Sequence, residues 1–226
     1  EPTSQLHLFN KSVMKTFLST LAAAGLLTSA SSGSLILTGI IDGSLSGGTP
    51  KAIELFVVSD IADLSLYGVE LVSNAGTSAG AIESVFTGSA TAGDYLYIAS
   101  EAINSALVFG EAPNTVTGDI NHNGDDDVYI YGPSGLIDVW GGSDGIDNSG
   151  TVADVLDSWA YRVNGTGPST TFDDSEWTIA PINSLDGLDA AGMAAATTFG
   201  TYAVPEPGAF ALIGLAGVFS ILRRRR

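Results

Sequence analysis

The stretch Asp127–Trp140, "DVYIYGPSGLIDVW", has the pattern of two short β-strands joined by a tight turn. Val128 and Ile130 share one face of the first segment, and two tyrosines share the other, because successive side chains of a strand face opposite ways. Residues 132–135 supply the turn residues Gly, Pro, Ser and Gly. The stretch therefore predicts an antiparallel hairpin with one apolar face.

The same pattern recurs along the middle of the chain, in short segments separated by turns rich in Gly and Asn. In Ala52–Val58, for example, Ile53, Leu55 and Val57 share one face. Many short strands of this kind predict an all-β fold, an antiparallel sandwich or barrel, and only residues 101–108 suggest a turn or two of helix. The predicted strands are 35–41, 52–58, 66–72, 84–86, 94–99, 127–131, 136–140, 159–163 and 177–179.

Charge and cysteine content narrow the class of protein. The whole chain carries 8 basic and 25 acidic residues. Between residues 31 and 204, only Lys51 and Arg162 face 23 acidic residues, which leaves a net charge of −21. Such a surface repels phosphate backbones, so we expect no nucleic acid partner. The chain has no cysteine, which excludes disulfides, thiolate metal sites and cysteine nucleophiles.

The N-terminal part of the chain has the layout of a secretory signal peptide at residues 14–30. Met14 and Lys15 form a short basic start, Phe17–Leu27 is an apolar run, and residues 28–30 are small enough for peptidase cleavage. The apolar run is too short for a stable membrane span. We therefore predict export by the Sec machinery, with residues 1–13 an upstream extension of the reading frame.

The C-terminal part of the chain predicts a short membrane anchor. Residues 209–222 carry no charge, and their apolar side chains lie all around the short apolar helix that they would form. Four arginines follow, and they would stay on the cytoplasmic side while the body lies outside. Residues 186–203 predict a terminal strand that passes, from residue 191, into a linker. The arginines are Arg223, Arg224, Arg225 and Arg226.

Pro205, Glu206 and Pro207 stand directly before the apolar run and the arginine cluster. With its parts in this order at the end of the chain, the segment 204–226 resembles the PEP-CTERM sorting signal. The resemblance implies recognition by an exosortase, a membrane transpeptidase-like enzyme that cleaves near the Pro-Glu-Pro. It also implies a transient inner-membrane anchor, followed by release or attachment at the cell surface or in an exopolysaccharide matrix.

Several segments of the body occur in the order found in lamin-tail domains, and the body, residues 31–190, resembles such a domain. The resemblance implies an immunoglobulin-like antiparallel β-sandwich. A fold of this kind does not by itself specify a chemistry. The segments are "TPKAIELFVVSDIADLSLYGVELVS" (49–73), "ATAGDYLYIAS" (90–100), "GDDDVYIYGPSGLIDVWGG" (124–142), "DSWAYRV" (157–163) and "EWTI" (176–179).

The stretch "DINHNGDDD" at 119–127 is the sharpest candidate for a metal site. Oxygen-bearing residues at its first, third and fifth positions, with Gly at the sixth, match the start of an EF-hand-type calcium loop. The twelfth position is Ile130, where a bidentate acid is needed, so the alternative is an acidic hairpin connection with an Asn-Gly turn. The candidate Ca²⁺ ligands are Asp119, Asn121, Asn123, Asp125 and Asp127.

A carbohydrate-binding face is another candidate, because aromatic rings stack on the apolar faces of sugars. Tyrosines opposite the apolar residues of their strands favour partial exposure, although strand propensity and sheet covering explain their presence more simply. The rings in question are Trp140, Trp159, Trp177, Tyr95, Tyr97, Tyr129 and Tyr131.

A catalytic site does not assemble from the sequence. Gly141–Gly145 satisfies G-x-S-x-G, but a poor helix start follows it, and His122, the single histidine of the body, precedes the serine. We therefore predict that the protein is not an enzyme, with a secreted hydrolase as a remote alternative. Asp138 stands in a strongly apolar strand, which predicts a strand edge or hydrogen bonds to a neighbouring loop.

The sequence thus supports two main hypotheses. The first is an exported, non-enzymatic β-sandwich protein with a structural or adhesive role, sorted by exosortase to the cell surface or the extracellular polysaccharide matrix. The second is a calcium-assisted carbohydrate-binding module built on residues 119–127 and the tyrosines.

Overall fold

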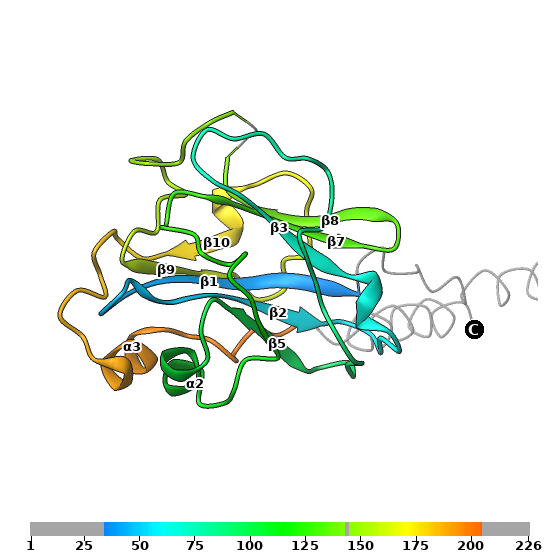
Figure 1. The fold of residues 1–226 in the computed structure, drawn as a ribbon, viewed down its shortest axis with the longest axis horizontal. Coiled ribbons are helices and arrows are strands. Elements are labelled where there is room, and N and C mark those ends of the chain that lie inside the picture. The colour runs from blue at the N-terminus through cyan, green and yellow to red at the C-terminus, as the bar shows by residue number, and fades with distance from the viewer. Residues whose placement is uncertain (1–33, 143–144, 205–226) are drawn as a thin grey trace, which may run out of the picture. The chain divides into compact units, whose positions relative to one another are not determined.

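The computed structural model describes residues 34–142 and 145–204, which form two β-sheets (Figure 1). Neighbouring strands of the larger sheet are, in order, β10 (Trp177–Ile179), β9 (Ser158–Arg162), β1 (Leu35–Leu45), β2 (Thr49–Val57), β5 (Tyr95–Ala99) and β6 (Thr115–Val116). The smaller sheet has the order β4 (Ser84–Val85), β3 (Gly68–Val72), β7 (Asp127–Gly132) and β8 (Gly135–Trp140).

The hairpin predicted from residues 127–140 is present as β7 and β8. The two strands pair antiparallel, with Val128 opposite Trp140 and Gly132 opposite Gly135. Val128 and Ile130 lie in the main hydrophobic core, as the alternation predicts. The strand β6 was not predicted, and its pairing with β5 is parallel, so the sheets are antiparallel except at this edge.

The main core lies between the two sheets. The larger sheet contributes side chains such as Ile53, Leu55 and Ile98, and the smaller sheet contributes others such as Val69 and Ile130, all of them almost without exposed surface. Burial of apolar area between two sheets is what stabilises a sandwich. The all-β sandwich expected from the sequence is therefore confirmed.

The outer face of the larger sheet is covered by segments that the alternation does not reveal. The helices α2 (Ile103–Phe109) and α3 (Ala190–Ala196) lie on the side of this sheet away from β3, β7 and β8 (Figure 1). Residues 197–204, here called the C-terminal strap, continue from α3 across the same face. The expected terminal strand and linker at 186–203 are therefore wrong, because α3 and the strap pack against the sheet.

The outer face of the smaller sheet is covered by residues 73–83 and by Phe172. The carboxylate of Glu70 on β3 accepts hydrogen bonds from the Tyr131 hydroxyl, at 2.7 Å, and from the Ala79 N–H, at 2.5 Å. The Ser78 hydroxyl also donates to Glu70, at 2.7 Å. This face is therefore closed by polar contacts as well as by apolar packing.

Several predictions fall outside the described residues. They concern the extension 1–13, the signal peptide 14–30, the apolar segment 209–222 and the sorting-signal residues 205–207 and 223–226. Within 34–142 and 145–204, no helix is both long and apolar enough to cross a membrane.

Candidate functional site

The C-terminal strap is held on the larger sheet by side chains that bind its backbone. The N–H of Gly200 donates to Glu54 Oε2 at 2.6 Å. The N–H groups of Thr201 and Tyr202 both donate to the Tyr161 hydroxyl oxygen, at 2.9 and 2.7 Å. Four successive N–H groups are bound in this way, because the N–H of the next residue, Ala203, donates to Asn164 Oδ1 at 2.9 Å.

We call Glu54, Tyr161 and Asn164 the strap latch. The sheet register brings two of its members together, because Gly39 on β1 pairs with Glu54 on β2 and with Tyr161 on β9. The Tyr161 hydroxyl donates to Glu54 Oε1 at 2.9 Å, and the Thr38 hydroxyl donates to the same oxygen at 2.6 Å. The latch is thus a preorganised row of acceptors supplied by β2, by β9 and by the turn that follows β9.

Gly39 is needed at the centre of this row. A Cβ atom at that position would lie 2.2 Å from the ring of Phe199, the strap residue that packs over it. The Phe199 ring also meets Phe109 of α2 edge-on, with 5.1 Å between centroids. The missing side chain of Gly39 therefore makes room for the apolar anchor of the strap.

Burial governs the electrostatics of the latch. Glu54 has no exposed surface, and this burial raises the pKa of its carboxyl, although the hydrogen bonds from Thr38 and Gly200 act in the opposite direction. Burial and the nearby Glu54 charge also raise the pKa of Tyr161. The phenol therefore stays protonated and donates to Glu54, while its oxygen accepts from the strap.

The strap ends in a further set of contacts made by Tyr202 and Ala203. The Tyr202 ring packs against Phe56, 5.3 Å between centroids, and the hydroxyl of Tyr95 donates to the Tyr202 carbonyl oxygen at 2.7 Å. The Tyr202 hydroxyl donates to the carbonyl oxygen of Thr166. The carbonyl of Ala203 accepts from the Gly165 N–H at 3.0 Å, so that both backbone groups of this residue are bound.

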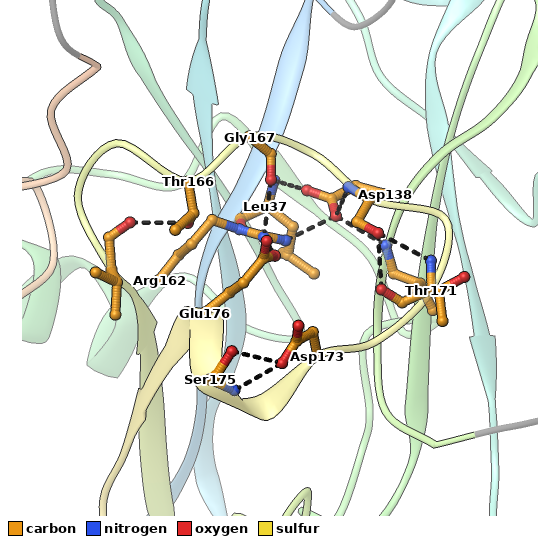
Figure 2. Close-up of polar contacts among 12 residues, drawn as sticks. Leu37, Asp138, Arg162, Thr166, Gly167, Thr171, Asp173, Ser175 and Glu176 are labelled. Carbon is orange, nitrogen blue, oxygen red and sulfur yellow. Dashed lines mark hydrogen bonds and ion pairs between the residues drawn. The ribbon is translucent and has the colours of Figure 1, made fainter.

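A second polar cluster joins the two sheets through the interior (Figure 2). Arg162 on β9 forms an ion pair with Asp138 on β8 at 2.7 Å and with Glu176 at 3.0 Å. The other Asp138 oxygen accepts from the Leu37 N–H of β1 at 2.8 Å, and the Leu37 carbonyl accepts from Arg162 Nε at 2.7 Å. The cluster therefore ties the smaller sheet to the larger one.

Asp138 satisfies the expectation that a carboxylate in an apolar strand needs partners. Besides Arg162, it accepts from the backbone N–H of Ser169 in a neighbouring loop, at 3.0 Å. Burial raises the pKa of Asp138 to about 6, against the opposing effect of the Arg162 charge. The role of this cluster is structural, because Arg162 and Asp138 are both closed off from solvent and surrounded by protein groups.

The predicted calcium loop is tied to protein partners at several points. Asp119 Oδ2 accepts from the Thr117 hydroxyl at 2.8 Å, and Asp127 Oδ1 accepts from Asn148 Nδ2 at 2.7 Å. Asn121 and Asn123 are exposed. Burial, with the charges of Asp126 and Asp147 next in importance, raises the pKa of Asp125.

No group of three or more acidic or histidine side chains within 34–142 and 145–204 is placed to hold a metal ion. The three aspartates of the predicted loop therefore do not converge as a ligand set. Calcium binding through the mixed set with Asn121 and Asn123 stays a prediction.

Most rings of the candidate aromatic face are not exposed, which agrees with the alternative of strand propensity and sheet covering. Tyr97, Tyr129, Tyr131, Trp140 and Trp177 are buried. Trp140 and Trp177 pack against each other edge-on in the main core, 4.8 Å between centroids, and the guanidinium carbon of Arg162 lies 4.5 Å from the Trp177 ring centroid. The tyrosines do face outward from their strands, as predicted, but covering segments shield them from solvent. Tyr95 and Trp159 are partly exposed.

His122 is buried, with no exposed surface. Burial lowers its pKa to about 4, and the nearby Lys51 charge acts in the same direction. Lys51 Nζ binds the His122 carbonyl oxygen at 2.5 Å and Asp42 Oδ1 at 2.6 Å. Of the G-x-S-x-G residues, Ser143 and Asp144 lie outside the described part of the chain.

Sequence reasoning missed the strap latch and the partner of Asp138. Glu54 offered a signal, since it is the one charged residue in the apolar strand 52–58 and a carboxylate there needs donors. Arg162 offered another, because it is one of only two cations between residues 31 and 204. Neither signal identifies its partners, which come from distant segments.

Residues 203–226 match the family model of the PEP-CTERM protein-sorting motif. No curated protein and no solved structure matches the chain. The fold and the motif together define an exported β-sandwich protein that carries a signal for sorting to the cell surface by exosortase. The lamin-tail resemblance, with its immunoglobulin-like topology, stays a prediction.

Proposed function

We propose that this protein is a non-enzymatic β-sandwich module, which exosortase cleaves from a transient membrane anchor and delivers to the cell surface or the extracellular polysaccharide matrix. Its role there is structural or adhesive. The observation that carries the proposal is the match of residues 203–226 to the PEP-CTERM protein-sorting motif. The Sec machinery would deliver the body across the membrane, and the polysaccharide matrix would be its surroundings.

The construction of the body supports a structural role. Both cations of residues 31–204 are used in ion pairs, since Lys51 binds Asp42 and Arg162 binds Asp138 and Glu176. The remaining acidic residues leave the body strongly anionic, which favours solubility and mutual repulsion of free copies. This chemistry suits a secreted module in a hydrated matrix.

The absence of catalysis is part of the proposal, and the position of His122 supports it. In a Ser-His triad, the histidine must reach both the nucleophile and the solvent-accessible substrate. His122 has no exposed surface, and burial lowers its pKa to about 4, which makes it a weak base. The serine of G-x-S-x-G therefore has no accessible histidine base in the body.

The test replaces Pro205, Glu206 and Pro207 by alanine in the full chain, expressed in cells that contain an exosortase. We expect the wild-type precursor to be shortened and to reach the cell surface or medium, and the triple variant to stay full-length in the membrane fraction. A triple variant that is shortened and sorted like the wild type would overturn the proposal. A matched control replaces Pro181, which lies in an exposed turn of the body, by alanine and should be sorted normally.

A further inference from the structure

The sorting motif begins on residues that the folded body already binds. The motif match starts at residue 203, and the strap remains packed up to that point. Ala203 is bound at both backbone groups, and the side chain of Tyr202, one residue earlier, has only 3% exposed surface. The folded body and the signal for cleavage are therefore contiguous, with no free linker between them in the described residues.

An enzyme that cleaves a peptide near Pro205–Pro207 must reach the backbone on both sides of the cleaved bond. The residues before the Pro-Glu-Pro are those of the strap. The backbone N–H groups of residues 200–203 donate hydrogen bonds to the latch, and the Phe199 ring lies over Gly39. The same backbone cannot be bound by the latch and by a second protein at once.

We propose that the latch row on the outer face of the larger sheet is a peptide-binding site whose occupant is the chain's own strap, and that its occupancy withholds the start of the sorting motif from exosortase. This inference rests on the proposed function. Strap release precedes cleavage, and the processing rate follows the population of the released strap. After cleavage the strap rebinds and closes the C-terminal end of the mature body.

The chain offers a matched internal control for this site. Tyr161 and Tyr131 are both buried tyrosines whose hydroxyls donate to a buried glutamate, at 2.9 Å to Glu54 and 2.7 Å to Glu70. Only the Tyr161 oxygen accepts from the strap, through Thr201 and Tyr202. Tyr161→Phe and Tyr131→Phe therefore each remove a hydroxyl that donates to a buried glutamate, and only the first change removes an acceptor of strap N–H groups.

The experiment follows the full-length precursor by pulse-chase in exosortase-containing cells, for the wild type, Tyr161→Phe and Tyr131→Phe. Cleavage of a transiently opened segment follows the open population when opening is fast. Loss of the hydrogen bonds at Tyr161 should shorten the precursor half-life by roughly fivefold or more, whereas Tyr131→Phe should leave it at the wild-type value. Phe199→Ala, a change within the strap itself, should act in the same direction as Tyr161→Phe.

A second measurement observes the strap directly. Amide hydrogen exchange at residues 200–203 of the purified full chain should accelerate in Tyr161→Phe and Phe199→Ala, and not in Tyr131→Phe. Thermal unfolding of each variant confirms that the body is folded.

Equal half-lives in Tyr161→Phe and Tyr131→Phe, or slower processing in Tyr161→Phe, would overturn the inference while leaving the sorting function intact. A wild-type precursor that is never shortened would overturn the sorting function together with the gating role. In that case amide hydrogen exchange at residues 200–203 still tests whether the strap occupies the latch. Unchanged exchange in Tyr161→Phe would show that the latch does not hold the strap.

Discussion

The outer faces of the two sheets are closed by the same set of contacts. On the larger sheet, Glu54 accepts from a tyrosine, from a threonine hydroxyl and from the N–H of Gly200 in the strap. On the smaller sheet, Glu70 accepts from a tyrosine, from a serine hydroxyl and from the N–H of Ala79 in the loop 73–83. A buried carboxylate with three donors is a stable way to bind a covering segment, because each charge-assisted hydrogen bond offsets part of the cost of burial.

The likeness extends to the glycines beside the tyrosines. Gly39 pairs with Tyr161 and leaves room for Phe199, and Gly68 pairs with Tyr131 and leaves room for Ile82, whose methyl group would lie 2.3 Å from an added Cβ. In both sheets the glycine admits an apolar side chain of the covering segment.

The two faces differ in where the covering segment leads. Residues 73–83 connect β3 to β4 and so return to the smaller sheet. The strap continues into the sorting motif at residue 203. On the smaller sheet, the buried glutamate and tyrosine therefore bind a loop that only connects two strands. On the larger sheet, the equivalent pair binds the segment that leads into the sorting signal. Substitutions can test how far the two faces depend on each other.

The largest effect is expected where the two sheets are tied together. Arg162→Met leaves Asp138 buried without its cation, and removal of one partner of a buried ion pair costs about 3–5 kcal/mol of unfolding free energy. Because the Arg162–Asp138 cluster connects the two sheets, amide hydrogen exchange should accelerate in the covering segments of both sheets. Denaturant unfolding measures the loss.

The control for this prediction is the double variant Arg162→Met with Asp138→Asn. Removal of the charge on Asp138 should recover part of the stability lost in Arg162→Met. A single variant as stable as the wild type would contradict the role of the cluster.

A change of pH should also act on both faces, through His122 in the connection from β6 to β7. Its pKa is about 4 in the folded protein, against about 6.5 in an unfolded chain. The unfolded chain therefore binds a proton first, so His122 contributes stability above about pH 6.5 that is lost as the pH falls toward 4. The loss amounts to about 3 kcal/mol.

The measurement compares the wild type with His122→Asn, because other groups titrate in the same range. Burial raises the pKa values of Asp42, Glu54 and Asp138, so their contributions have the opposite sign and are lost as the pH rises. The difference in unfolding free energy between wild type and His122→Asn should shrink by about 3 kcal/mol between pH 6.5 and 4. A constant difference would show that His122 titrates normally.

The smallest effect should separate the two faces. Gly39→Ala places a Cβ within 2.2 Å of the Phe199 ring, and we expect a loss of about 1–3 kcal/mol with faster amide exchange at 200–203 only. Exchange at residues 78–80 over the smaller sheet should not change. Phe199→Leu in the Gly39→Ala background should restore part of the loss, and exchange that accelerates equally on both faces would contradict the independence of the latch.

The fold was largely predictable because alternation is a local property of the sequence. Ile53, Leu55 and Val57 face the core as the period of two requires. The burial of Tyr97 and Tyr131 was not predictable, because it depends on packing against Phe109 of α2 and against the loop 73–83, which strand alternation does not show. The helix α3 had a local signal that was overlooked: Asp189 caps it by accepting from the Gly192 N–H at 2.8 Å, and an alanine-rich run follows.

The candidate site also has parts that the sequence predicts and parts that it does not. The sorting motif at 203–226 is linear, and an enzyme reads it as sequence, so the residues alone identify it. The need of Asp138 for hydrogen-bond partners also follows from the sequence, because a carboxylate in an apolar strand cannot be left unpaired. The identity of Arg162 as its partner does not follow, because any loop or strand could have supplied the charge.

The sequence by itself determined the class of sheet, the inward faces of the strands and the signal that directs sorting, since each is written in neighbouring residues. Only the tertiary structure decided what closes the sandwich and what binds the start of the motif. Leu37 and Asp138 are 101 positions apart, and Glu54 and Gly200 are 146 apart. Such pairs form because folding brings distant donors to carboxylates that burial would otherwise leave unsatisfied, and the sequence shows only that such donors are required.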